Sequence, residues 1–146
     1  MAGNRRLGER TGLRVHRLGC LLLEEVEHRL RPLGLASRSY FVLDGIDRDP
    51  PPSQQDLARA LGIDANAVVI AVDDLERAGF VVRRRNTADR RRYDLHLTDA
   101  GRSALSAAHD ATDDAEQDFF GALDAGQRDA LDAALRVLLR DKIPLG

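Results

Sequence analysis

Six arginines stand close together in the middle of the chain, within the segment RRRNTADRRR at residues 83–92. A single acid, Asp89, accompanies them, so six positive charges less one negative charge leave an excess of +5 in a protein whose net charge is −2. Guanidinium groups this close repel one another unless an anion lies between them, and a nucleic-acid phosphate backbone supplies such anions. The segment therefore predicts a phosphate-binding loop, with a solvated charged loop as the alternative.

The arginine-rich segment is expected to form the tip of a β-hairpin. Residues 80–85 and 92–97 alternate in the period of a half-buried strand, and the NTADRR stretch between them is too polar to be anything but an exposed loop. We expect Tyr93, Leu95 and Leu97 on one face of the second strand. Asp94 and His96 are then expected on the other face.

Two helices are predicted directly before this hairpin. Ser53 is a good N-cap with Asp56 in capping-box position, and Gly62 ends the first helix because glycine turns left-handed without steric cost. Asp64 caps the second helix, whose inward face recurs at helical spacing and comprises Val68, Ala71, Val72 and Leu75. This arrangement is a helix-turn-helix, whose second helix can enter the major groove of DNA.

The same residues resemble a known family. The runs LARALGI, DDLERAGFV, DRR and LTDAG look like the winged helix-turn-helix core of the MarR family of bacterial transcriptional regulators. The most specific match is the wing motif Asp-x-Arg followed by Leu-Thr-x-x-Gly, here residues 89–91 and 97–101. The resemblance implies a dimer that binds pseudo-palindromic duplex DNA and often releases it on meeting a small molecule or an oxidant.

The whole chain is expected to be one mainly α domain, residues 1–146, with a small β-wing. The winged core spans residues 36–101, and dimerisation helices flank it at residues 7–31 and 102–143. The apolar edges of these terminal helices are longer than the core needs, which favours a homodimer. From Thr98 onward ten acids oppose five bases, so this part should face away from DNA.

The composition, 43% hydrophobic and 32% charged, is typical of a soluble globular protein. The sequence has no apolar run near 18 residues and no apolar stretch of signal-peptide type at its start, so we expect a cytoplasmic protein that does not bind membranes. The one cysteine excludes an internal disulfide.

The outward face of the second helix is expected to read bases. Asn66 suits bidentate contact with adenine, and Val69 or Ile70 suits a thymine methyl group, with Ala65 beside them. This face departs from the usual family pattern of Ser, Thr and Arg. More of the sequence discrimination is therefore expected to come from DNA shape.

Phosphate contacts are expected on both sides of that helix. Ser53, Gln54 and Gln55, at the start of the preceding helix, suit phosphate binding by hydroxyl, amide and backbone N–H groups. The resemblance gives Arg91 the minor-groove role, with Asp89 orienting it. The remaining wing residues expected to bind phosphates are Arg83, Arg84, Arg85, Arg90 and Arg92.

An effector site is less evident in the sequence. The resemblance places one in the cleft between the dimer helices and the winged core, where the candidate lining residues are His16, Cys20, Tyr40, Phe41 and His109. Tyr40 and Phe41 alternatively belong to the core, and Cys20 is either an oxidation sensor or a packed small residue. His16, Cys20, Glu24 and His28 recur every fourth residue, but each step adds about 6 Å of rise and drifts about 40° around the helix. We therefore expect no metal site, and no cofactor is indicated.

Catalysis is not indicated either, because the sequence has no glycine-rich phosphate loop, no His-Glu-x-x-His motif and no nucleophile elbow. The acid pairs at 73–74 and 113–114 are adjacent in sequence, so on a helix they point about 100° apart. The expected function is a sequence-specific regulator that binds double-stranded DNA, acting as a ligand- or stress-responsive repressor. The alternative is a winged-helix module for protein or RNA contacts, which the apolar Val69 and Ile70 favour and the arginine tip opposes.

Overall fold

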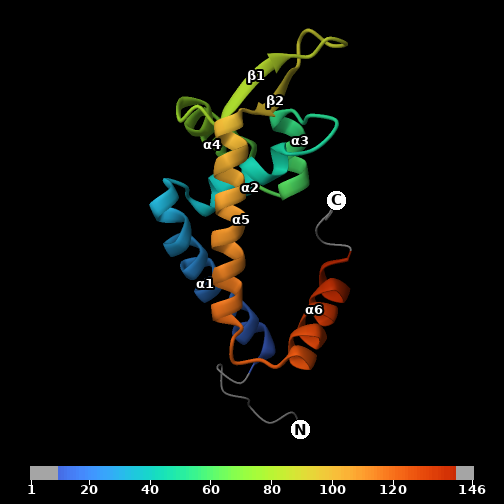
Figure 1. Cartoon of the computed structure of the whole chain (residues 1–146). Helices are drawn as coiled ribbons and strands as arrows, with labels where there is room; N and C mark the ends of the chain where they lie inside the picture. The colour runs from blue at the N-terminus through green and yellow to red at the C-terminus, as the bar shows by residue number, and fades with distance from the viewer. Residues whose placement is uncertain (1–9, 141–146) are drawn as a thin grey trace.

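The computed structural model describes residues 10–140. Residues 7–9 and 141–143, which the sequence assigned to dimerisation helices, lie outside this part. The elements in chain order are α1 (Thr11–Leu30), η2 (Arg31–Leu33), α2 (Ser37–Ile46), α3 (Gln54–Leu61), α4 (Ala65–Arg77), β1 (Val81–Arg85), β2 (Tyr93–Leu97), α5 (Asp99–Phe119) and α6 (Ala125–Leu139). The mainly helical fold with an antiparallel two-stranded wing is confirmed (Figure 1).

The predicted ends of the two central helices are confirmed in atomic detail. Ser53 and Asp56 form a reciprocal capping box at the start of α3, and Gly62 ends that helix in the left-handed conformation with φ 64°. The Asp64 carboxylate accepts the backbone N–H groups of Asn66 and Ala67 and so caps α4. These contacts satisfy amide groups that a helix start otherwise leaves unpaired.

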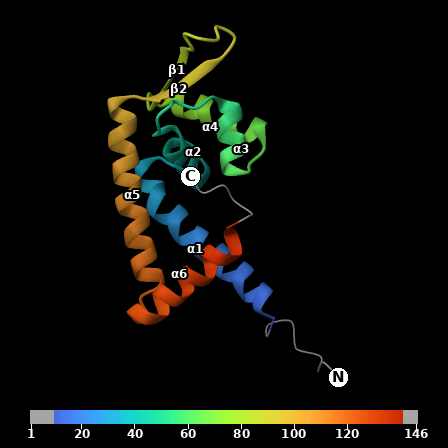
Figure 2. The same cartoon turned by 90° about the vertical axis from the view of Figure 1, so that its right-hand side faces the viewer.

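The core of the winged unit lies where α2, α3, α4 and the sheet meet. Its fully buried side chains come from each of these elements and include Val42, Leu43, Leu57, Val68, Val72 and Leu95. The long helix α5 runs from the base of the wing to the opposite end of the molecule, with α1 packed against it and α6 turning back from its far end (Figure 2). No residue of α6 is buried within the described chain.

The Leu-Thr-x-x-Gly motif joins the wing to α5. Thr98 donates its hydroxyl to the Gly79 carbonyl at 2.6 Å and accepts the Gly101 N–H at 3.0 Å, which caps the helix. Gly101 lies so close to the residue just before β1 that an added Cβ would stand 2.0 Å from the Phe80 carbonyl oxygen. The motif therefore fixes the contact between the wing and the helix.

The alternation expected along β2 is wrong at its first two residues. Tyr93 is 45% exposed, and Asp94 is only 9% exposed. The wing projects beyond the helices at this point (Figure 1), so no core remains to cover Tyr93. The Asp94 carboxylate is held instead by Asn86 Nδ2 at 2.7 Å and by Arg92 Nε at 3.1 Å.

No helix within residues 10–140 combines the length and the apolar character that a bilayer crossing requires.

Candidate nucleic-acid interface

The tip of the wing is shaped by its own side chains. Asn86 Oδ1 accepts the backbone N–H groups of Ala88 and Asp89, both at 2.8 Å. Asp89 Oδ1 in turn accepts the backbone N–H of Arg91 at 3.0 Å. Asp89 thus orients the main chain of Arg91, whereas the sequence-based expectation left open which part of Arg91 it holds.

Four of the six arginines lie exposed on the hairpin. Arg85 Nε donates to the Tyr93 hydroxyl at 3.2 Å, and its guanidinium carbon lies 5.7 Å from the centre of that ring. Within residues 10–140, no carboxylate pairs with Arg84, Arg90 or Arg91. These side chains remain open to an external anion.

Arg83, near the base of the wing, is held by the protein itself. Its guanidinium group forms ion pairs with both Asp73 and Glu76 of α4. The contact joins β1 to the second helix of the helix-turn-helix. Arg83 therefore neutralises acidic groups on that helix, a role that the charge count of the sequence did not reveal.

Arg92 makes a matching contact on the other strand. Its guanidinium Nη2 lies 2.7 Å from Asp56 Oδ2 at the start of α3, and its Nε lies 3.1 Å from Asp94 Oδ1. Hydrogen bonds from Ser53, with the nearby charge of Arg92, hold the pKa of Asp56 below its usual value. The bond to Asp94 correspondingly raises the pKa of Arg92. This contact attaches β2 to α3.

The start of α3 and the wing together border one cavity of about 420 Å³. Its lining includes Ser53, Gln54 and Gln55 from the helix and Arg91 and Arg92 from the wing, so the structure brings these predicted residues together. The Gln54 amide nitrogen is buried and has no hydrogen-bond partner among residues 10–140. The cavity also includes Arg59 and Tyr93, which sequence reasoning did not select. The one sequence signal for Arg59 is its position three residues after Asp56, where the two side chains can pair on a helix.

The outward face of α4 is the one predicted. Val69 and Ile70 are 39% and 59% exposed, and Ala65 and Asn66 are exposed beside them. Arg77, the one basic residue of α4, bonds to Asp74 at 2.6 Å. The face is therefore apolar at its centre.

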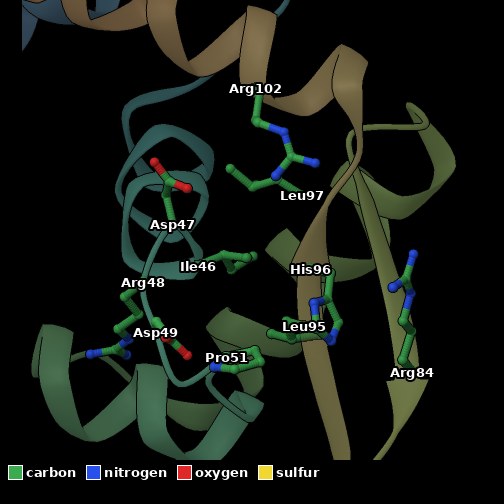
Figure 3. Close-up of a pocket in the computed structure, with 10 residues that line it drawn as sticks. All are labelled: Ile46, Asp47, Arg48, Asp49, Pro51, Arg84, Leu95, His96, Leu97 and Arg102. Atoms are coloured by element: carbon green, nitrogen blue, oxygen red, sulfur yellow. The ribbon is translucent and has the colours of Figure 1, made fainter.

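A groove of about 520 Å³ lies on the other side of the hairpin, between β2 and the loop that joins α2 to α3 (Figure 3). Asp47 and Asp49 lie on its loop side, whereas Arg84, His96 and Arg102 come from the sheet and α5. Arg48 also lies on the loop side, so three arginines oppose two aspartates and the groove carries an excess of +1. The cavity between α3 and the wing has the same balance, so the charge of the lining alone does not distinguish the two.

The effector candidates fall into two groups. The Tyr40 ring lies 5.6 Å from that of Phe41 and 5.7 Å from that of His109, whose Nε2 lies 2.8 Å from Asp44 Oδ1. Burial raises the pKa of Tyr40. This group joins α2 to α5.

His16 and Cys20 lie instead on an exposed face of α1, with Sγ 3.7 Å from Nε2. In the described chain no contact links them to the aromatic group around Tyr40. Nor does any cluster of three or more potential metal ligands occur among residues 10–140.

Comparison with known proteins decides the family. A family model described as MarR family matches residues 33–92. The transcriptional repressor CouR, solved bound to a 23-mer DNA duplex, is 32% identical, with a TM-score of 0.83 over 90% of this chain and 94% of that chain. The chain belongs to the MarR family. Proteins of this family are DNA-binding transcriptional regulators and not enzymes.

Other MarR-family relatives agree with this assignment. A transcriptional regulator from Rhodococcus sp. RHA1 is 27% identical, with a TM-score of 0.85 over 95% of this chain and 99% of that chain. A regulatory protein for the hcr operon of Thauera aromatica is 36% identical over 107 residues, which span 73% of this chain and 64% of that protein. CouR from Rhodococcus jostii RHA1, bound to p-coumaroyl-CoA, also matches, at 28% identity with a TM-score of 0.82 over 95% of this chain and 98% of that chain.

Proposed function

We propose that this MarR-family chain is a homodimeric repressor that binds a pseudo-palindromic operator in double-stranded DNA. The observation that carries the proposal is the shared cavity of the α3 start and the wing, beside the exposed face of α4. A helix start and a basic wing in this arrangement suit one DNA strand between them. The helix α4 then enters the adjacent major groove.

In this proposal the exposed arginines of the wing contact different parts of the DNA. Arg91, whose main chain Asp89 fixes, enters the minor groove. Arg84, Arg85 and Arg90 contact phosphates, together with the hydroxyl and amide groups at the start of α3.

Exposed apolar side chains support the homodimer. They lie on the helices farthest from the wing and comprise Val15, Leu18, Leu21 and Leu23 of α1 and Leu135, Val137 and Leu138 of α6. Exposed apolar area of this extent is typical of an interface rather than of a free surface. A second copy of the chain, related by a two-fold axis, would cover both helices at once.

The decisive experiment is selection of bound duplexes from a random pool, followed by binding at several salt concentrations. We expect two-fold repeats with half-sites about 10 base pairs apart. We also expect single-stranded RNA to compete poorly. Recovery of no duplex at low ionic strength, or equal competition by RNA, would favour the protein- or RNA-interaction alternative instead.

Arg91→Ala tests the wing directly. The substitution should weaken binding and flatten the dependence of log K on log salt by about 0.9, because one positive charge fewer then displaces counterions from the DNA. Arg136→Ala is the control, because Arg136 lies on α6, away from the wing, and pairs with Asp132. Sedimentation of both variants would verify that they remain dimers.

An effector is proposed at the aromatic group around Tyr40. CouR, a relative solved with p-coumaroyl-CoA, supports a small aromatic acid or its thioester as the ligand class. Phe41 is exposed next to Tyr40, which suits stacking with an aromatic ring. Release of bound duplex by p-coumaroyl-CoA but not by CoA, abolished in Phe41→Ala, would support this site. Equal release from both proteins would exclude it.

A further inference from the structure

We propose that α4 reads its half-site mainly through pyrimidine 5-methyl groups, contacted by Ile70 and Val69. DNA affinity then depends on whether the pyrimidines at these positions carry that methyl group. The inference rests on the proposed function and names the base feature that the same surface recognises.

The exposed position of these two side chains is fixed by their neighbours on the helix. Val68 and Val72 are fully buried and Ala71 is nearly so, which sets the rotation of α4 against the core. Val69 and Ile70 consequently point away from the core and cannot turn inward without exposing those residues. Two adjacent branched apolar side chains thus form the centre of the surface presented to the groove.

The charged side chains of α4 are engaged elsewhere. Asp73 and Glu76 are both bound by Arg83 of the wing. Arg77 is bound by Asp74 at 2.6 Å. Arginine contact with guanine is the commonest specific contact in the major groove, but the single arginine of α4 is its last residue, about two turns beyond Ile70. Hydrogen bonding to guanine is therefore not the principal means of recognition.

Asn66 supplies the remaining polar contact. Its side chain lies one turn before Ile70 on the same face, so the two side chains reach neighbouring bases. An asparagine amide suits adenine, and the methyl group of thymine is the one apolar feature in the major groove. The two residues together specify adjacent A·T pairs, with the thymine methyl against Ile70.

Uracil substitution in the selected operator tests the proposal, because deoxyuridine differs from thymidine only by this methyl group. Replacing a contacted thymine by uracil should weaken binding about fourfold for each methyl group removed. A position changed from thymine to cytosine should lose affinity, and 5-methylcytosine there should recover part of it. Unchanged affinity, within twofold, for duplexes with uracil at every thymine position would overturn the proposal.

Protein variants identify the side chain involved. Ile70→Ala, at a largely exposed position, should bind the thymine duplex more weakly and lose most of the difference between thymine and uracil. Arg84→Ala is the matched control, since loss of a phosphate contact should weaken both duplexes by the same factor. A difference between thymine and uracil that persists undiminished in both Ile70→Ala and Val69→Ala would overturn the assignment.

The two proposals fail in distinguishable ways. If the random pool yields no bound duplex, the repressor proposal itself fails. If it yields an operator that binds tightly yet ignores uracil, the repressor proposal stands and the methyl contact alone is wrong.

Discussion

Replacing Arg92 separates two roles that an arginine in the wing can have. The sequence assigned this residue to phosphate binding, whereas the structure places its guanidinium group between Asp56 of α3 and Asp94 of β2. A phosphate contact contributes to the salt dependence of binding, but an internal ion pair that positions the wing contributes to stability. Arg92→Ala therefore distinguishes the roles by two independent measurements.

The magnitudes follow from the geometry. Arg92 donates to one carboxylate at 2.7 Å and to another at 3.1 Å, and its side chain is about two-fifths exposed. Partial exposure screens such pairs, so we expect the melting temperature to fall only slightly, by about 3 °C or less at fixed protein concentration. DNA affinity should fall because the wing is less well held, while the salt slope should change by less than about 0.3.

Arg91→Ala is the matched comparison one residue away. Its side chain has no carboxylate partner among the described residues, so its melting temperature should not change. Its salt slope should fall by about 0.9 per wing, or about 1.8 for a dimer. In a double-mutant cycle, the effects of Arg92→Ala and Asp56→Ala on stability should not be additive, because the two side chains form one ion pair. If Arg92→Ala leaves the melting temperature unchanged and lowers the salt slope as much as Arg91→Ala, the internal role is refuted.

Three further predictions concern the fold and its assembly. Gly101→Ala should lower the melting temperature by several degrees in thermal denaturation because its Cβ would overlap the Phe80 carbonyl, whereas Gly12→Ala, with nothing within 4 Å, should not. Asp56→Asn should melt below the wild type at pH 7. The pKa of Asp56 is lower in the folded protein than in the unfolded chain, where it is about 3.9. The carboxylate therefore stabilises the fold above that pH, and this stabilisation is lost as the pH falls through the folded-state pKa. Melting curves at pH 7 and pH 3 should show the difference in melting temperature between Asp56→Asn and the wild type becoming smaller at pH 3. Leu138→Asp should shift the protein toward monomer in sedimentation equilibrium, and an unchanged mass would argue against α6 in the interface.

The local structure could be predicted from the sequence because short-range rules determine it. The capping residues Ser53 and Asp64, the left-handed Gly62 and the inward face of α4 all follow from contacts within a few residues. The sequence assigned the α3 start and the wing separately to phosphate binding, but it did not place the two side by side. Spacing alone does not fix that approach, which depends on how the sheet packs against the helices.

The charges of the wing could be counted from the sequence, but the ion-pair partner of each arginine could not be predicted from it. Arg83 and Arg92 have the same sequence context as Arg84 and Arg91, yet their partners come from helices that precede them by up to 36 residues. Nothing in the spacing identifies which arginine reaches Asp56 or Asp73. The burial of Asp94 was missed because it depends on Asn86 across the turn, together with Arg92 two residues before it.

The two internal arginine contacts have a mechanical consequence. Arg83 fastens one strand of the hairpin to α4, and Arg92 fastens the other strand to α3, so neither strand can swing without breaking an ion pair. These ion pairs favour movement of α4 and the hairpin as one unit. In a homodimer, an effector would then change the separation and tilt of two such units. The arrangement of α4 and the hairpin within each unit would stay the same.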